Sequence, residues 1–156
     1  MLILVITTVI AANCSHHVDN YQEETPRMVV QKFYNALVNG EISKAAYYLS
    51  EKFALDMIEL MGGMDRLYQE LQLIAFAFGN SSELPLTYDQ LMEMTEKEVV
   101  VFLIYVLGKD EFDNFRLEIL SEEIDGNQAV VEINNFDEVE IHLIKESGKW
   151  KIYPDF

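Results

Sequence analysis

The chain has 156 residues, half of them hydrophobic, and a formal net charge of −16, which together indicate one globular domain. Its eleven basic residues are scattered among twenty-seven acidic ones, which excludes nucleic-acid binding because Lys and Arg must displace counterions from the phosphates. The same charge disfavours an anionic lipid surface, so membrane attachment needs a covalent anchor or a hydrophobic segment. The single cysteine excludes an internal disulfide framework.

An uncharged apolar run, Leu2–Ala12, ends two residues before Cys14. It is shorter than the roughly 20 residues of a membrane-spanning helix and fits the roughly 7 to 15 of a signal-peptide core. The sequence Ala-Ala-Asn-Cys resembles a bacterial lipobox, although Ala11 and Asn13 depart from its usual residues and no Lys or Arg precedes the run. We expect a signal peptide over 1–13 and a lipid on Cys14. A plain signal peptide or a buried first strand are the alternatives.

Residues 14–24 are polar and predict a flexible tether between the lipid and the domain. His16 and His17 are neighbours in it, and two imidazoles without a Cys or carboxylate at ligand spacing are expected to be solvated. The sequence contains no Gly-rich phosphate loop, nucleophile elbow, paired-His zinc motif or calcium loop. We therefore predict no metal and no cofactor.

Helical periodicity dominates the chain from Thr25 onward. Thr25 can cap free backbone amides and Pro26 tolerates the first helical position, so a helix is expected to begin there. Asn39 and Gly40 supply the left-handed residue that ends it, and Ser43 offers the cap of a second helix. The predicted helices run from Thr25 to Asn39, from Ser43 to about Ala54, from Met57 to Met61 and from Met64 to about Phe78.

The stretch Val99–Leu107 is a run of nine apolar residues that suits either a buried strand or a buried helix. Thr95 and Glu98 have the spacing of a capping box, and Gly108 followed by Lys109 suits a helix end. These flanking residues favour a helix that ends near Gly108.

Alternation with a period of two begins at Phe115 and runs to Ile124. Turn signals follow at Asp125-Gly126-Asn127 and at Ser147-Gly148. Helices followed by a four-stranded antiparallel meander predict an α+β domain over 25–156, with the helices packed on one face of the sheet. The residues expected to face the core are Ala129, Val131 and Ile133, then Val139, Ile141 and Leu143, then Trp150 and Ile152.

The sequence at both ends of the predicted domain resembles that of a known superfamily. Thr25–Phe53 resembles the opening helix pair of the nuclear-transport-factor-2-like superfamily, while Glu122–Ile133 and Gly148–Pro154 resemble the hairpin and last strand of its bacterial lipoprotein branch. The intervening part, 56–109, is longer than in compact members. The resemblance implies a curved sheet wrapped around a long helix, as a cone whose interior is often a pocket. It implies no single chemistry, since members include isomerases, cyclases, dehydratases and binding modules.

The resemblance also suggests candidate catalytic residues. Ketosteroid isomerases carry a Tyr on the first helix that hydrogen-bonds an enolate, and Tyr34 stands in that register, with Asp56 near the position of the proton-shuttling Asp. No second oxyanion donor matches. Because proton transfer needs a base and an oxyanion partner on one substrate, we interpret Tyr34 first as a residue at the edge of the core. His142 is expected on the outer face of its strand, not as a base.

Three functions remain open from the sequence. The first is an exported, lipid-anchored protein on the extracytoplasmic side of the bacterial cell envelope, whose domain binds a small apolar ligand or an envelope protein without catalysis. The second is an isomerase- or cyclase-like enzyme using Tyr34 and Asp56. The third is a dimerisation module that pairs through Val130, Ile144 and Tyr153 on the outer sheet face. The resemblance suggests a pocket lined by Tyr34, Tyr48, Asp56 and Trp150.

The lipid anchor is directly testable. A bacterial host grown with a labelled fatty acid should label the wild-type protein and not Cys14→Ser, because only the thiol of Cys14 can carry the thioether-linked diacylglycerol. Gel fluorography of the immunoprecipitated protein measures the label. A Ser15→Ala variant should stay labelled, and label that persists in Cys14→Ser would contradict the anchor.

Overall fold

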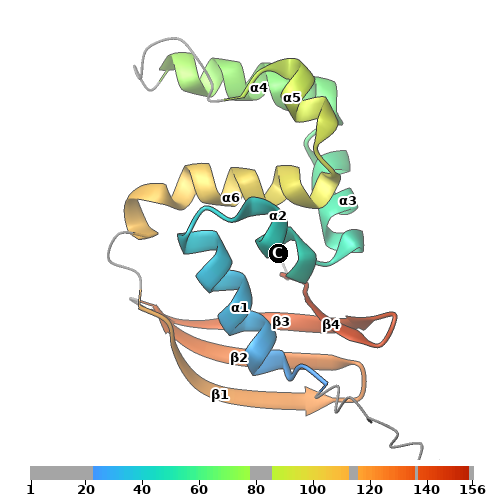
Figure 1. Cartoon of the computed structure of the whole chain (residues 1–156), viewed down its shortest axis with the longest axis vertical. Helices are drawn as coiled ribbons and strands as arrows, with labels where there is room; N and C mark the ends of the chain where they lie inside the picture. The colour runs from blue at the N-terminus through green and yellow to red at the C-terminus, as the bar shows by residue number, and fades with distance from the viewer. Residues whose placement is uncertain (1–22, 78–85, 113–115, 136, 155–156) are drawn as a thin grey trace, which may run out of the picture.

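The computed structural model describes residues 23–77, 86–112, 116–135 and 137–154. Within these residues six helices precede four antiparallel strands, which confirms the predicted α+β class (Figure 1). The helices are α1 (Pro26–Val38), α2 (Ile42–Tyr48), α3 (Glu51–Leu60), α4 (Met64–Ala77), α5 (Tyr88–Glu93) and α6 (Glu96–Phe112), and the strands are β1 (Glu118–Asp125), β2 (Gln128–Asn135), β3 (Asp137–Glu146) and β4 (Lys149–Ile152). The predicted signal peptide, Cys14 and both histidines of the predicted tether lie outside the described residues.

Helix α1 begins and ends where the sequence predicts. The Thr25 hydroxyl accepts a hydrogen bond from the Met28 amide at 3.3 Å, and Pro26 occupies the first turn. At the other end Gly40 has a φ of +69°, which a residue with a side chain rarely adopts. The amide of Gly40 donates to the carbonyl of Leu37, which satisfies one of the last carbonyls of the helix.

The prediction of one helix from Ser43 to Ala54 is wrong, because the helix is interrupted between α2 and α3. Leu49 is extended, with a ψ of 144°, and forms a parallel bridge to Ile152 of β4. The Ser50 amide donates to the Ile152 carbonyl at 2.9 Å, and the Ser50 hydroxyl caps α3 at the amide of Phe53. Ser43 caps nothing: it lies inside α2 and donates to Glu98.

The predicted helix over Val99–Leu107 is confirmed as α6, and so is its capping box, since the Glu98 amide donates to the Thr95 hydroxyl and the Glu98 carboxylate accepts from the Thr95 amide. Its predicted end at Gly108 is wrong, because the helix runs on to Phe112. A side chain at Gly108 would meet the Phe112 ring at 2.9 Å. Because Gly108 has no side chain, the Phe112 ring can pack against it, and the helix continues past Gly108.

Helices α4 and α5 lie apart from the sheet, with α6 between them and the strands (Figure 1). Helix α5 was not predicted from the sequence. Its start is a second capping box, in which the Gln90 amide donates to the Thr87 hydroxyl and the Gln90 side chain accepts from the Thr87 amide.

The sheet is the predicted meander, with strand order β1-β2-β3-β4 and every pair antiparallel. Gly126 turns β1 into β2 at a φ of +59°, and Ser147 and Gly148 turn β3 into β4 at +50° and +78°. Strand β1 begins at Glu118, later than predicted, and a register shift between Ile119 and Ser121 marks a bulge.

Helix α1 packs across one face of the sheet and contacts β1, β2 and β4, while α2 and α3 pack on α6. The predicted inward residues of β2 and β4, together with Leu143, are buried against α1. Two residues predicted to face the core are exceptions: Val139 is 41% exposed and Ile141 is half-buried, and both lie on β3 before the stretch that pairs with β4. On the opposite face Val130 and Ile144 are half-buried, whereas the Tyr153 ring lies edge-on to Phe53 of α3 at 6.1 Å.

Two leucines give a matched test of this core. Leu37 on α1 is 1% exposed and Leu60 on α3 is 80% exposed. Leu37→Ala should lower the free energy of unfolding by about 2 to 5 kcal/mol, because it removes buried methyl groups and leaves a cavity. Leu60→Ala should change it by less than about 0.5 kcal/mol. Urea unfolding followed by circular dichroism measures both, and equal losses would contradict the packing of α1.

Candidate functional site

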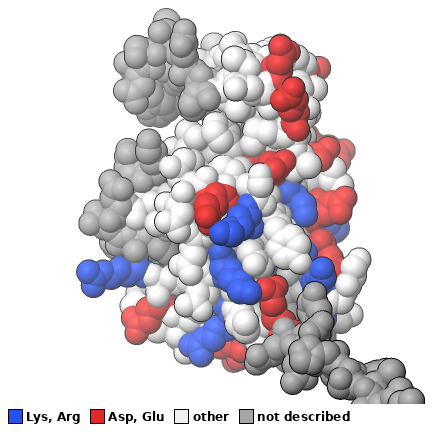
Figure 2. All heavy atoms as spheres, in the orientation of Figure 1, with Lys and Arg blue, Asp and Glu red and all other residues white. Residues whose placement is uncertain are grey.

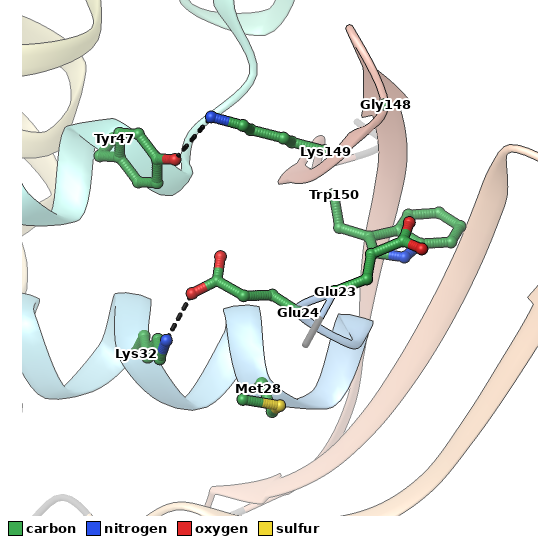
Figure 3. A pocket seen from close by; sticks show the side chains of 8 residues that line it. All are labelled: Glu23, Glu24, Met28, Lys32, Tyr47, Gly148, Lys149 and Trp150. Carbon is green, nitrogen blue, oxygen red and sulfur yellow. Dashed lines mark hydrogen bonds and ion pairs between the residues drawn. The ribbon is translucent and has the colours of Figure 1, made fainter. Parts of the chain in front are cut away.

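A pocket of about 510 Å³ opens between the start of α1, the end of α2 and the β3–β4 turn (Figure 3). The first two helices of the domain build it together with a turn that lies far later in the sequence. Its lining combines apolar and aromatic side chains with charged ones of both signs. The lining residues are Glu23, Glu24, Met28, Lys32, Tyr47, Gly148, Lys149 and Trp150.

The helical wall of the pocket follows from residue spacing. Glu24, Met28 and Lys32 are four residues apart, which places them on one side of α1 and its entry segment. Figure 3 shows the Glu24 side chain pointing along α1 to the ammonium of Lys32, to which it is hydrogen-bonded. This bond raises the pKa of Lys32.

The aromatic residues of the pocket come from α2 and β4. Trp150 is the only tryptophan of the chain and is 5% exposed, while Tyr47 is 46% exposed. Tyr47 packs edge-on against Tyr48, with ring centroids 5.1 Å apart. The pocket thus combines a buried indole with an accessible phenol ring, a pairing that suits an apolar ligand with a polar end.

Lysines of the β3–β4 hairpin stand over these two rings. Lys145 pairs with Trp150 across the strands, and its ammonium lies 4.9 Å from the indole centroid. The Lys149 ammonium donates to the Tyr47 hydroxyl at 3.2 Å, and the Lys151 ammonium lies 3.9 Å from the Tyr47 ring centroid. Cation–π attraction stabilises these arrangements.

Lys151 is the most unusual of these cations because it is only 8% exposed. Its ammonium donates to the Tyr47 carbonyl in the last turn of α2, where the helix dipole carries partial negative charge. Burial lowers the pKa of Lys151, and the nearby charges of Lys97 and Lys149 lower it further. No carboxylate among the described residues forms an ion pair with Lys151. Lys151 is therefore a buried ammonium with no direct ion pair among the described residues, which is costly, although the charges of Glu146 and Glu24 act on it favourably and partly offset the lowering of its pKa.

Two carboxylates enter the pocket from the segment before α1. Glu23 forms an ion pair with Lys145 at 2.9 Å, and Glu24 forms one with Lys32. The side chains of Glu23 and Lys32 are 67% and 44% exposed, so solvent screens both pairs and each contributes little to stability.

This concentration of positive charge is unexpected in a chain with a net charge of −16. Four of the eleven basic residues lie in or beside the pocket: Lys32, Lys145, Lys149 and Lys151. In the view of Figure 2, basic and acidic side chains are interspersed over α1, α2 and the sheet, whereas the region over α4 and α5 shows acidic ones. An anion that enters the pocket would therefore meet several cations beside Glu23 and Glu24.

Of the four residues predicted to line a pocket, Trp150 lines this one, and Tyr48 lies behind Tyr47. Tyr34 and Asp56 line neither this pocket nor a second one of about 340 Å³ beside Arg27. Asp56 is exposed on α3 and forms an ion pair with Lys52 at 2.8 Å. Tyr34 packs edge-on against Phe33 at 5.4 Å, and burial raises its pKa to about 12.

Sequence reasoning missed the lysines, although the sequence contains a signal for them. Lys145, Lys149 and Lys151 fall within seven residues on both sides of a turn, and they flank the only tryptophan of an acidic chain. Each lysine alone is typical of a solvated strand edge. Only the pairing of β3 with β4 and the approach of α2 bring them to one place.

In the described part of the chain no group of three or more His, Cys, Asp or Glu is placed to hold a metal ion. None of the helices described there is long and apolar enough to span a membrane. His142 is half-buried on the outer face beside Val130, and lies 3.7 Å from Glu140.

The buried phenol of Tyr34 predicts a pH dependence. Because its pKa is about 12 in the folded protein and about 10 in the unfolded chain, its contribution to stability is complete below pH 10 and is lost between pH 10 and 12. Between these pH values wild type should lose about 2 to 3 kcal/mol more than Tyr34→Phe in urea unfolding. Identical pH profiles of the two proteins would contradict the burial of Tyr34.

No protein-family model, curated protein or solved structure matches the chain. A function for the chain must therefore be inferred from the geometry of the pocket.

Proposed function

We propose that this is an exported, lipid-anchored protein of the bacterial cell envelope whose domain binds a small, mostly apolar ligand without catalysis. The observation that carries the proposal is the pocket between α1, α2 and the β3–β4 turn. Its volume of about 510 Å³ falls within the range of small-molecule sites, roughly 300 to 1,000 Å³. Met28, Tyr47 and Trp150 supply apolar surface for such a ligand.

The arrangement of acids and bases supports binding over turnover. A general base and its oxyanion partner must both reach one substrate. Asp56 forms an ion pair with Lys52 on the surface of α3, and Tyr34 packs half-buried at the edge of the core, so the two residues named for an isomerase-like reaction have different surroundings. Neither contributes to the wall of the pocket.

The membership in the nuclear-transport-factor-2-like superfamily remains part of the proposal. Its support is the order of elements, with a long first helix across one face of an antiparallel sheet that follows the helices. The envelope location has separate support from the apolar run before Cys14. Residues 23 and 24, the last of the predicted tether, lie at the pocket, so the tether joins the domain there.

Native mass spectrometry of the protein, purified gently from a bacterial host, tests the proposal. We expect an added mass that disappears on denaturation. Emission from Trp150 should also shift when the ligand is returned, because no other tryptophan contributes to the signal. A Tyr47→Ala variant should carry at least about tenfold less ligand, since it removes one aromatic wall.

Tyr88 offers a matched control for that variant. It is 40% exposed, close to the 46% of Tyr47, but lies on α5 away from the pocket. Tyr88→Ala should therefore leave the bound mass unchanged. A bare protein whose Trp150 emission responds to no apolar compound would contradict the proposal. A bare dimer that dissociates on Ile144→Glu would favour a dimerisation module instead.

A further inference from the structure

We infer that the pocket recognises the carboxylate of an amphiphilic acid, and that Glu23 and Glu24 occupy its lysines until the ligand displaces them. The inference rests on the proposed function and specifies the chemistry of its site. Its basis is the contrast between the many cations at the pocket and the weak carboxylate partners that they have within the chain.

The lysines form an anion site with graded burial. Lys151 is 8% exposed, and its ammonium donates to the Tyr47 carbonyl and lies over the Tyr47 ring, while Glu146 and Glu24 act on it by charge without forming an ion pair. Lys149 reaches the same tyrosine from the lining of the pocket. Because positive charges that converge in a partly desolvated place attract an anion strongly, a carboxylate beside Tyr47 would lower the electrostatic cost of all of them.

The chain itself shows that carboxylates fit this place. Glu23 forms an ion pair with Lys145, whose ammonium lies over Trp150, and Figure 3 shows Glu23 next to the indole. Glu24 forms an ion pair with Lys32 on the helix that also carries Met28 of the pocket lining. An amphiphilic acid makes the same two contacts with one molecule, since its carboxylate meets a lysine while its body covers the indole or the thioether. The two glutamates thus resemble the polar end of the expected ligand.

The exposure of these pairs makes them displaceable. The Glu23 side chain is 67% exposed and the Lys32 side chain 44% exposed, so water screens both ion pairs. A ligand whose apolar body excludes water from the pocket would make a stronger bond to the same lysines. Ligand binding therefore releases the segment before α1 from the pocket.

A pair of probes that differ only in charge tests this inference on the full chain. The probes are 4-phenylbutyrate and its uncharged amide, 4-phenylbutanamide, titrated against Trp150 emission with excitation that spares the phenyl ring. We expect the acid to bind at least about tenfold more tightly than the amide, and added salt to weaken only the acid.

Substitutions distinguish the role of the lysines in binding the acid from the role of the glutamates as competitors. Lys149→Met should weaken binding of the acid by about tenfold and should leave the affinity for the amide within about twofold of wild type. Glu23→Gln combined with Glu24→Gln should tighten the acid several-fold, because it removes the competing carboxylates and frees Lys32 and Lys145. Glu41→Gln, which breaks the exposed pair with Lys44 on α2, is the matched control and should change neither probe.

The outcomes distinguish this inference from the proposed function. If both probes bind equally, or if the double glutamine variant weakens the acid, the pocket binds apolar ligands but the carboxylate site is wrong. If neither probe changes Trp150 emission in wild type or in the double variant, both the pocket and the carboxylate site are wrong. Binding of the acid that is at least about tenfold tighter than that of the amide, strengthened by the glutamine pair and weakened by Lys149→Met, supports both.

Discussion

The contact between the Leu49–Ser50 junction and the last strand fixes how α2 and α3 are placed relative to β4. The Ser50 amide donates to the Ile152 carbonyl at 2.9 Å, and the Ser50 hydroxyl donates to Glu146 at 2.6 Å, which joins residues about a hundred positions apart. This junction ends α2, starts α3 and brings the end of α2 beside β4. Tyr47 thereby reaches the lysines of the hairpin, so the pocket depends on a backbone contact outside it.

Features fixed by neighbouring residues were predictable from the sequence. Thr25 and Thr95 marked two helix starts, Gly40 marked a helix end, and Gly126 marked a hairpin, because each acts within a turn or two of its own position. The break at Leu49 was not predictable, since its cause is a hydrogen bond to a strand at the other end of the chain. The bulge in β1 likewise depends on pairing with β2.

The candidate site was predicted less well than the fold, for a related reason. Trp150 was expected on the inner face of the last strand and in the pocket that the resemblance suggests, and it lines the pocket. Tyr34 and Asp56 came from a resemblance to enzymes, and their surroundings here are a core and a surface ion pair. Charged side chains show no periodic burial in a sequence, so a buried lysine such as Lys151 becomes visible only when the elements around it are assembled.

The free edge of the sheet has a further consequence for how the molecules tolerate crowding. Among the described residues strand β1 lies at the end of the strand order and pairs only with β2, so apart from the Ile119 carbonyl, which accepts from Arg27, its outer edge could pair with another strand. Four of its eight residues, Glu118, Glu122, Glu123 and Asp125, are acidic. Two such edges brought together would place carboxylates opposite carboxylates and repel. Many copies can therefore lie close together without pairing edge to edge into a continuous sheet, which protects the protein from aggregation at high local concentration.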